Sequence, residues 1–166
     1  LPGDLILTGD LDGVSYKFSN RETLRGVSTG NSVFTFSPFA NSNDDINVFE
    51  GTPITKQFIV GQEEEPIYVI PDENMDIGNV IVSVFSSTKD LTETSSPTVY
   101  TNLLDATELK SNSTVYVLRE SPNGFFELTF GNGTTLGTKH KSNNVVDVDY
   151  LRSSGSSGNG IRVLKL

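Results

Sequence analysis

The stretch VYVLRESPNGFFELTF, residues 115–130, decides the fold class of this chain. Its two flanks, 115–120 and 125–130, are short and rich in the β-branched and aromatic residues that strands prefer. The four residues between the flanks are Ser-Pro-Asn-Gly, and an Asn-Gly pair supplies the positive φ angles that a tight hairpin turn requires. The stretch therefore predicts an antiparallel hairpin of two strands.

A second two-residue alternation follows in residues 145–151. Side chains of a strand point alternately to its two faces, so Val146, Val148 and Tyr150 are predicted to face the core. Asp147 and Asp149 lie between them and are predicted to face outward.

Strand patterns continue toward the N-terminus. Residues 14–19 alternate after an Asp-Gly turn at 12–13, which predicts another hairpin. Residues 79–85 form the most apolar run, which is short and β-branched and therefore predicts a buried strand rather than a helix. Only 103–109 has the pattern of one or two helical turns. Further short strand patterns occupy 5–8, 33–36, 46–50, 55–60 and 67–70.

The chain is therefore predicted to be mainly β: an antiparallel sandwich or barrel-like domain of short strands with long loops and little helix. We expect one β-rich domain over residues 1–166, excised from a longer chain, because no initiator Met is present and the sequence ends within an alternating run. A division into two subdomains, about 1–50 with 145–166, and 51–144, is the alternative.

Composition excludes several classes of function. The 166 residues include no Cys and one His, which excludes a thiol nucleophile, a Cys-ligated zinc site and a multi-His metal site. The formal net charge of −9 argues against binding to nucleic acid, because phosphates need a basic surface. No apolar run approaches the roughly 20 residues of a membrane span.

Two aspartate pairs resemble metal ligands. Asp10-x-Asp12-Gly13 opens like a calcium loop, but Ser15 and Arg21 occupy the positions where such a loop needs Gly and a bidentate Glu. A hairpin turn is therefore the favoured interpretation. No His or third carboxylate is tied by spacing to Asp147 and Asp149, so the outer face of a strand is favoured there.

The remaining candidate groups are carboxylates, a histidine and two glycosylation sequons. Glu63, Glu64 and Glu65, and then Asp72 with Glu73, flank one predicted strand, and we expect both groups to be solvated loops. His140 lies between two lysines without a Gly-x-Ser-x-Gly turn, so a solvated loop is again expected. The sequons begin at Asn112 and Asn132, and they matter only in a eukaryotic secreted protein.

The C-terminal third combines the segments 115–120, 125–137 and 144–160 in that order. Read as one unit, these segments resemble the middle region of baseplate wedge proteins of contractile-tailed phages, the baseplate J-like family. Residues 115–120 resemble its "Y-x-x-x-E" strand, and 125–137 its "Y-E-x-x-F-G-D/E-G-x-x-G" strand and turn. Residues 144–160 resemble "N-x-V-x-V-x-Y-L-x-T-S-G-x-x-x-N-G". Asn132 stands where the family usually has Asp or Glu, and the spacing from Gly133 to Gly137 is one residue longer than usual.

Segments nearer the N-terminus agree in order with the same family. Pro2-Gly3 with 13–18 resembles its "P-x-G-T-x-F … Y-x-F" segment, 48–51 its "V-x-E-G" segment, and 70–84 its "I-P-N-x-x-I-D … V-x-V" segment. The resemblance spans nearly the whole chain and consists mainly of strands, turns and glycines. Gly131, Gly133 and Gly137 permit a tight reversal after an aromatic strand, which Phe126 or Phe125, with Phe130, would anchor in the core.

This resemblance implies a structural, non-enzymatic subunit that joins a ring around the tail hub and changes shape when the sheath contracts. It implies no catalytic residue, cofactor or metal. The expected partners are other baseplate wedge proteins and copies of the chain itself, with no nucleic acid, membrane or small-molecule substrate. The expected location is the virion tail baseplate, assembled in the cytoplasm of the bacterial host. The exposed places expected to contact partners are 86–98 and 63–65.

Three alternatives remain open. The first is a baseplate component of a related contractile injection or secretion system. The second is a host-surface binding module of a phage tail, against which the absence of Trp argues, since such modules use aromatic platforms. The third is a tail-associated hydrolase, for which the sequence offers no convincing catalytic set.

Overall fold

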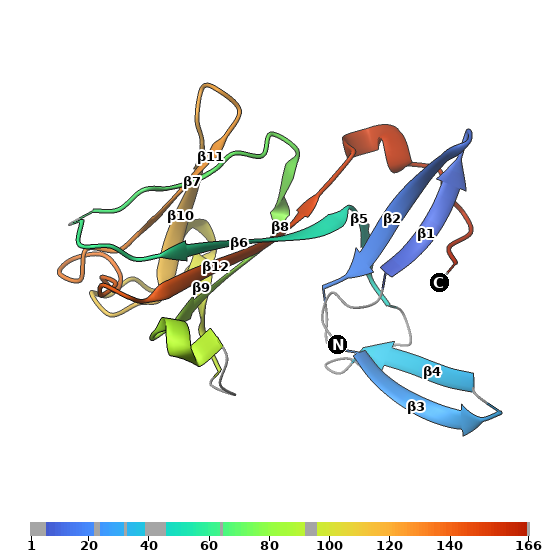
Figure 1. Cartoon of the computed structure of the whole chain (residues 1–166), viewed down its shortest axis with the longest axis horizontal. Coiled ribbons are helices and arrows are strands. Elements are labelled where there is room, and N and C mark those ends of the chain that lie inside the picture. The colour runs from blue at the N-terminus through green and yellow to red at the C-terminus, as the bar shows by residue number, and fades with distance from the viewer. Residues whose placement is uncertain are drawn as a thin grey trace. The chain divides into compact units, whose positions relative to one another are not determined.

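The fold was analysed in a computed structural model, which describes residues 6–21, 24–31, 33–38, 46–63, 65–91 and 96–165. Pro2-Gly3 of the resemblance, Glu64, and 92–95 within the expected contact loop lie outside the described residues. Figure 1 shows short strands joined by long loops. The strands are β1 (Ile6–Leu11), β2 (Val14–Asn20), β3 (Leu24–Gly30), β4 (Val33–Pro38), β5 (Val48–Glu50), β6 (Thr52–Ile59), β7 (Tyr68–Ile70), β8 (Met75–Phe85), β9 (Thr98–Asn102), β10 (Val115–Glu120), β11 (Phe126–Phe130) and β12 (Val145–Arg152).

The helical content of the described residues is three short 3₁₀ helices, η1 (Thr88–Leu91), η2 (Leu103–Asp105) and η3 (Gly155–Gly158). The predicted class, mainly β with short strands and little helix, is confirmed. The helical prediction over 103–109 is wrong beyond η2, because the backbone is already extended at Ala106.

The chain divides into two compact units, residues 1–53 with 151–166 and residues 54–150. In unit 1, β1, β2 and β5 form a three-stranded sheet, and β3 and β4 form a separate two-stranded sheet. The β1–β2 hairpin turns at Asp12 and Gly13, whose φ angles are +51° and +82°. This geometry confirms the hairpin interpretation of the calcium-like sequence.

Unit 2 contains a nearly closed, barrel-like sheet of seven strands. The hydrogen-bonded order is β6-β12-β8-β9-β10-β11-β7. The pairs are antiparallel for β8 with β9, β10 with β11 and β11 with β7, whereas β9 and β10 run parallel. The parallel pair is possible because a long connection, residues 103–114, returns the chain to the same end of the sheet.

The predicted hairpin at 115–130 is confirmed as β10 and β11. Tyr116 pairs with Phe130 and Glu120 with Phe126. The turn lies where the Asn-Gly pair predicts it, and the Gly124 amide donates to the Ser121 carbonyl at 2.9 Å, but Gly124 alone has a positive φ, of +79°, and Asn123 does not.

The core of unit 2 is built from the inward residues of this sheet. Val146, Val148 and Tyr150 of β12 are fully buried, as their alternation predicts, and Asp147 and Asp149 are less buried. Burying each such apolar side chain contributes about 1.5–3 kcal/mol of transfer free energy. Other members of the core are Val60, Tyr68, Ile70, Met75, Val82, Val84, Tyr100, Tyr116, Phe126 and Leu128.

Candidate functional site

The glycine-rich segment that carries the resemblance, residues 131–137, forms one compact turn after β11. The Asn132 amide donates to the Leu136 carbonyl and the Gly133 amide to the Gly137 carbonyl, both at 2.8 Å. Gly133 and Gly137 have φ angles of +75° and +64°, which glycine adopts without steric cost. Gly131 is required for space: a Cβ on it would lie 2.1 Å from the Leu136 oxygen. We call residues 131–137 the motif turn.

The Asn132 side chain holds the motif turn together by accepting hydrogen bonds from its backbone amides. Its Oδ1 accepts hydrogen bonds from the backbone amides of Thr134, Thr135 and Leu136 at 2.9, 3.0 and 3.2 Å. The same oxygen accepts a hydrogen bond from the Thr134 hydroxyl at 3.0 Å, and Asn132 Nδ2 donates one to Thr135 Oγ1 at 3.1 Å. Since three amides converge on one oxygen, a side-chain acceptor is the physical requirement at this position, and Asp provides one as well.

Two substitutions test this requirement. Asn132→Ala removes the acceptor and is expected to lower the free energy of unfolding by about 1–2 kcal/mol. Asn132→Asp keeps it, gains charge-assisted bonds, and is expected to be at least as stable as the native chain at neutral pH. Urea unfolding of both variants measures the difference. Equal midpoints for the two variants would show that the oxygen is unimportant.

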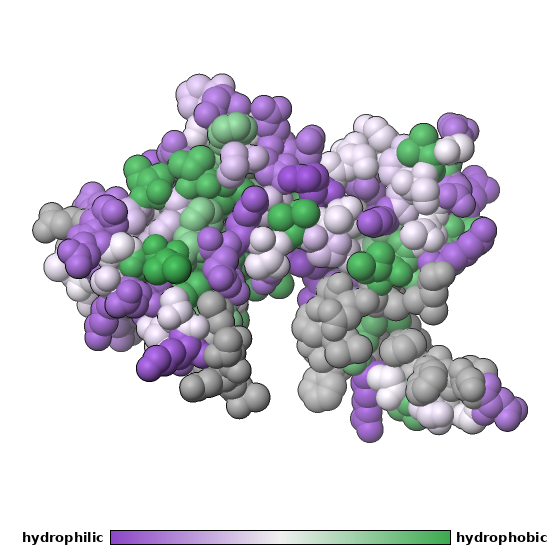
Figure 2. All heavy atoms as spheres, in the orientation of Figure 1, coloured by the Kyte–Doolittle hydropathy of each residue, from purple (hydrophilic) through white to green (hydrophobic). Residues whose placement is uncertain are grey.

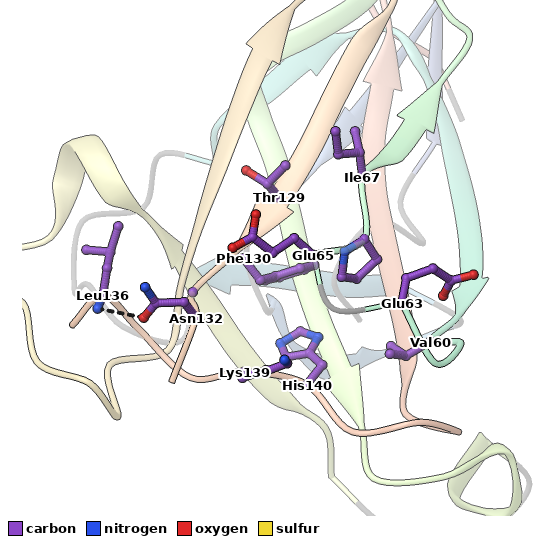
Figure 3. Close-up of a pocket in the computed structure, with 12 residues that line it drawn as sticks. Val60, Glu63, Glu65, Ile67, Thr129, Phe130, Asn132, Leu136, Lys139 and His140 are labelled. Atoms are coloured by element: carbon purple, nitrogen blue, oxygen red, sulfur yellow. Dashed lines mark hydrogen bonds between the residues drawn. The ribbon is translucent and has the colours of Figure 1, made fainter. Parts of the chain in front are cut away.

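A cavity of about 320 Å³ opens beside the motif turn. In Figure 3, His140 and Phe130 lie next to each other in its wall, and the Glu65 side chain lies near Phe130. The walls combine apolar side chains with a few ionisable groups. The lining residues are Val60, Glu63, Glu65, Pro66, Ile67, Thr129, Phe130, Gly131, Asn132, Leu136, Lys139 and His140.

His140 contradicts the expectation of a solvated loop. The loop folds back so that the imidazole packs on the Phe130 ring, with a centroid distance of 4.1 Å, and on Tyr100 at 5.2 Å. Both ring nitrogens are buried and have no hydrogen-bond partner in the structure. Burial lowers the pKa of His140 from 6.5 to about 4, because the charged form loses its hydration. The imidazole is therefore neutral at physiological pH.

This histidine predicts acid sensitivity. With a pKa near 6.5 in the unfolded chain and about 4 in the folded one, the unfolded state takes up the proton first as the pH falls. The stability that comes from keeping His140 neutral is therefore fully present above pH 6.5, and the free energy of unfolding falls as the pH drops from 6.5 to 4. The ionisable groups that share its cavity are Glu63, Glu65 and Lys139.

The matched variant is His140→Phe, which keeps an aromatic ring and removes the proton site. We expect a flatter pH dependence of the unfolding midpoint between pH 6.5 and 4. At pH 4 we expect the free energy of unfolding of the variant to exceed that of the native chain by about 1–2 kcal/mol. The difference is this small because solvent screens the partly buried imidazole. Urea unfolding across that range measures it. A slope identical to that of the native chain would contradict the role of His140.

The carboxylates predicted as solvated loops divide into two groups. Glu63, Glu65 and Glu73 are exposed, as expected. Asp72 is a correction, because it is only 5% exposed and accepts a hydrogen bond from the Tyr150 hydroxyl at 2.8 Å. Tyr150 lies on β12, and the hydrogen bond from its hydroxyl group compensates in part for the cost of burying the Asp72 carboxylate.

The outward aspartates of β12 accept hydrogen bonds from the neighbouring strand β6. Asp147 accepts a hydrogen bond from Gln57 Nε2 at 2.8 Å, and Asp149 accepts one from the Thr55 hydroxyl. Both donors lie on β6. Among the residues that the structure describes, no group of three potential metal ligands occurs.

Glu50 has a role that the sequence patterns did not indicate. Its carboxylate accepts hydrogen bonds from Ser153 Oγ at 2.7 Å, from the Ser154 amide at 2.9 Å and from Ser154 Oγ at 2.7 Å. A Cβ on the neighbouring Gly51 would lie 2.9 Å from Leu151 Cβ. The only sequence signal was the resemblance, in which both segments occur.

Comparison of the chain with protein-family models and with curated proteins finds no match. Within the described residues, no helix has the length and apolar character needed to cross a membrane.

Proposed function

We propose that this chain is a structural, non-enzymatic domain of a baseplate wedge subunit in a contractile tail. Its role is to hold other wedge proteins and further copies of the subunit around the tail hub and to take part in triggering sheath contraction. The particle is a contractile-tailed phage or a related contractile injection system. The proposed location is the tail baseplate of the particle, assembled in the bacterial cytoplasm.

The observation that carries the proposal is that polar side chains of the family-like segments bind one another. Glu50, in the segment like "V-x-E-G", binds Ser153 and Ser154, which lie about 100 positions later in the sequence, directly after strand β12. Asp72, in the segment like "I-P-N-x-x-I-D", binds Tyr150 of that strand. Residues that hold segments of one chain together are those that a scaffold needs.

The motif turn supports the same interpretation. Asn132 directs its oxygen to backbone amides of the turn, and Gly131 leaves room for the carbonyl of Leu136. These residues therefore shape the backbone. A binding module or a hydrolase would instead be expected to direct motif side chains toward a ligand.

The proposal is tested by labelling particles from the source of this sequence with an antibody raised against the chain. We expect immuno-electron microscopy to show label at the baseplate end of the tail. We also expect that deleting the gene leaves particles without a complete baseplate. Label on tail fibres or on the host surface, or intact baseplates in the deletion strain, would refute the proposal.

A further inference from the structure

The seven-stranded sheet of unit 2 leaves two strand edges without a hydrogen-bonded neighbour. Its order begins with β6 and ends with β7, so each has one edge that no other described strand pairs with. On the inner side, the rings of Phe58 and Tyr68 meet across this gap at a centroid distance of 5.2 Å. We call the two facing edges the β6–β7 seam. Unpaired edges of this kind bind extended chains unless charges, bulges or covering segments protect them.

The outer surface at the seam carries three exposed apolar side chains beside the polar Thr55 and Gln57 of β6. Ile59, beside Phe58, is 62% exposed, and Ile67 and Val69, on either side of Tyr68, are 59% and 46% exposed. Figure 2 shows several groups of hydrophobic residues, with hydrophilic residues between them, on the visible face of unit 2. Apolar side chains that flank an unpaired edge favour a partner that contributes both backbone and apolar contacts.

A polar group at the seam also lacks a hydrogen-bond partner. Tyr68 is 7% exposed, and its hydroxyl is buried without a hydrogen-bond partner in the structure. Burial and the nearby Glu63 carboxylate both raise the pKa of Tyr68. The hydroxyl is therefore a neutral donor beside an acidic group.

The cavity beside the motif turn lies at one end of the seam, since Val60 follows β6 and Ile67 precedes β7. In Figure 3 the Glu65 side chain extends across Phe130, and Lys139 lies beside His140. Glu63 and Glu65 are exposed, and no cation lies within ion-pair distance of either among the described residues. The exposed Glu63 and Glu65 carboxylates would attract a Lys or Arg side chain of a partner, although the same lining includes one cation, Lys139.

We propose that the seam binds an extended segment of a partner protein as an eighth strand along the free edge of β7. A basic side chain of that segment enters the cavity and pairs with Glu65. The net charge of −9 favours a basic partner over an acidic one. This inference deepens the proposed function and rests on it for the partner being a protein.

The test uses the whole chain, labelled with ¹⁵N, and two capped peptides, Val-Thr-Val-Arg-Val-Thr-Val and the same sequence with Glu in place of Arg. We expect the Arg peptide to shift the amide signals of Ile67 and of β7, and the Glu peptide to bind at least about tenfold more weakly. Shifts elsewhere, equal binding of the two peptides, or no binding would overturn the proposal.

Two pairs of variants localise the binding. Glu65→Lys is expected to weaken the Arg peptide about tenfold, and the control Glu73→Lys, at another exposed glutamate, is expected to leave it unchanged. Val69→Asp is expected to weaken it similarly, whereas Val99→Asp, at a strand valine with 60% exposure, is not. Equal effects within either pair would overturn the proposal.

Two further outcomes separate this inference from the proposed function. Concentration-dependent dimers that are lost in Val69→Asp would assign the seam to a second copy of the chain and overturn the partner assignment. Failure of peptide binding rejects the seam alone, because the position of antibody label on the particle is measured independently.

Discussion

Gly131→Ala is expected to destabilise unit 2 by about 3 kcal/mol or more, although it adds a single methyl group. The added Cβ would lie 2.1 Å from the Leu136 oxygen and 2.3 Å from the Gly137 carbonyl carbon. Both obstacles are backbone atoms that the motif turn holds in place by hydrogen bonds, so no side-chain rotation relieves the clash. The lower midpoint of urea unfolding measures the effect.

Gly78→Ala is the matched control for this substitution. Gly78 also lies in unit 2, its φ is not positive, and the nearest atom to its Cβ is a side-chain atom, an Asp76 carboxylate oxygen at 3.3 Å, rather than backbone. We expect a change within about 1 kcal/mol of the native chain. If Gly131→Ala unfolds at the same urea concentration as Gly78→Ala, the close packing of the motif turn is wrong.

Tyr150→Phe is expected to cost about 1–3 kcal/mol, because it removes a hydrogen bond to a buried carboxylate while leaving the ring in place. The coupling is measured by a double-mutant cycle with Asp72→Asn. We expect an interaction free energy of about 1 kcal/mol or more between the two sites.

Tyr68→Phe is the control, for which we expect no loss of stability. The Tyr68 hydroxyl is buried without a hydrogen-bond partner, so its removal is expected to be neutral or stabilising. Additive effects of the Asp72 and Tyr150 substitutions, or equal losses in the two Tyr→Phe variants, would contradict the proposed link between the 70–84 segment and β12.

The hairpins and several single strands were predictable because they have clear local patterns, whereas the order of strands in the sheets was not predicted. The alternation in β12, the Asn-Gly turn between β10 and β11, and the Asp-Gly turn between β1 and β2 each act over a few residues. The strand β3 was not predicted, since its sequence Leu-Arg-Gly-Val-Ser-Thr-Gly has two glycines and little alternation. It pairs with β4 through a ladder whose register shifts between Ser28 and Gly30.

The roles of individual polar residues were less predictable, because they depend on contacts between distant segments. Asp72 stands next to a glutamate in sequence and looks solvated, yet it binds Tyr150, 78 positions later. His140 lies between two lysines, yet its loop places the ring against β9 and β11. The neighbouring residues in the sequence suggest that such a group is exposed, because burying it costs free energy, and they do not show which distant segment packs against it.

The most direct test of the central claim, that this chain is a scaffold unit of a contractile-tail baseplate, is a cryo-electron microscopy map of the intact particle. We expect density for the seven-stranded sheet of unit 2 in repeated copies around the tail hub, in contact with other wedge proteins. Density for this sheet in a tail fibre, or its absence from the baseplate of a complete particle, would contradict the account.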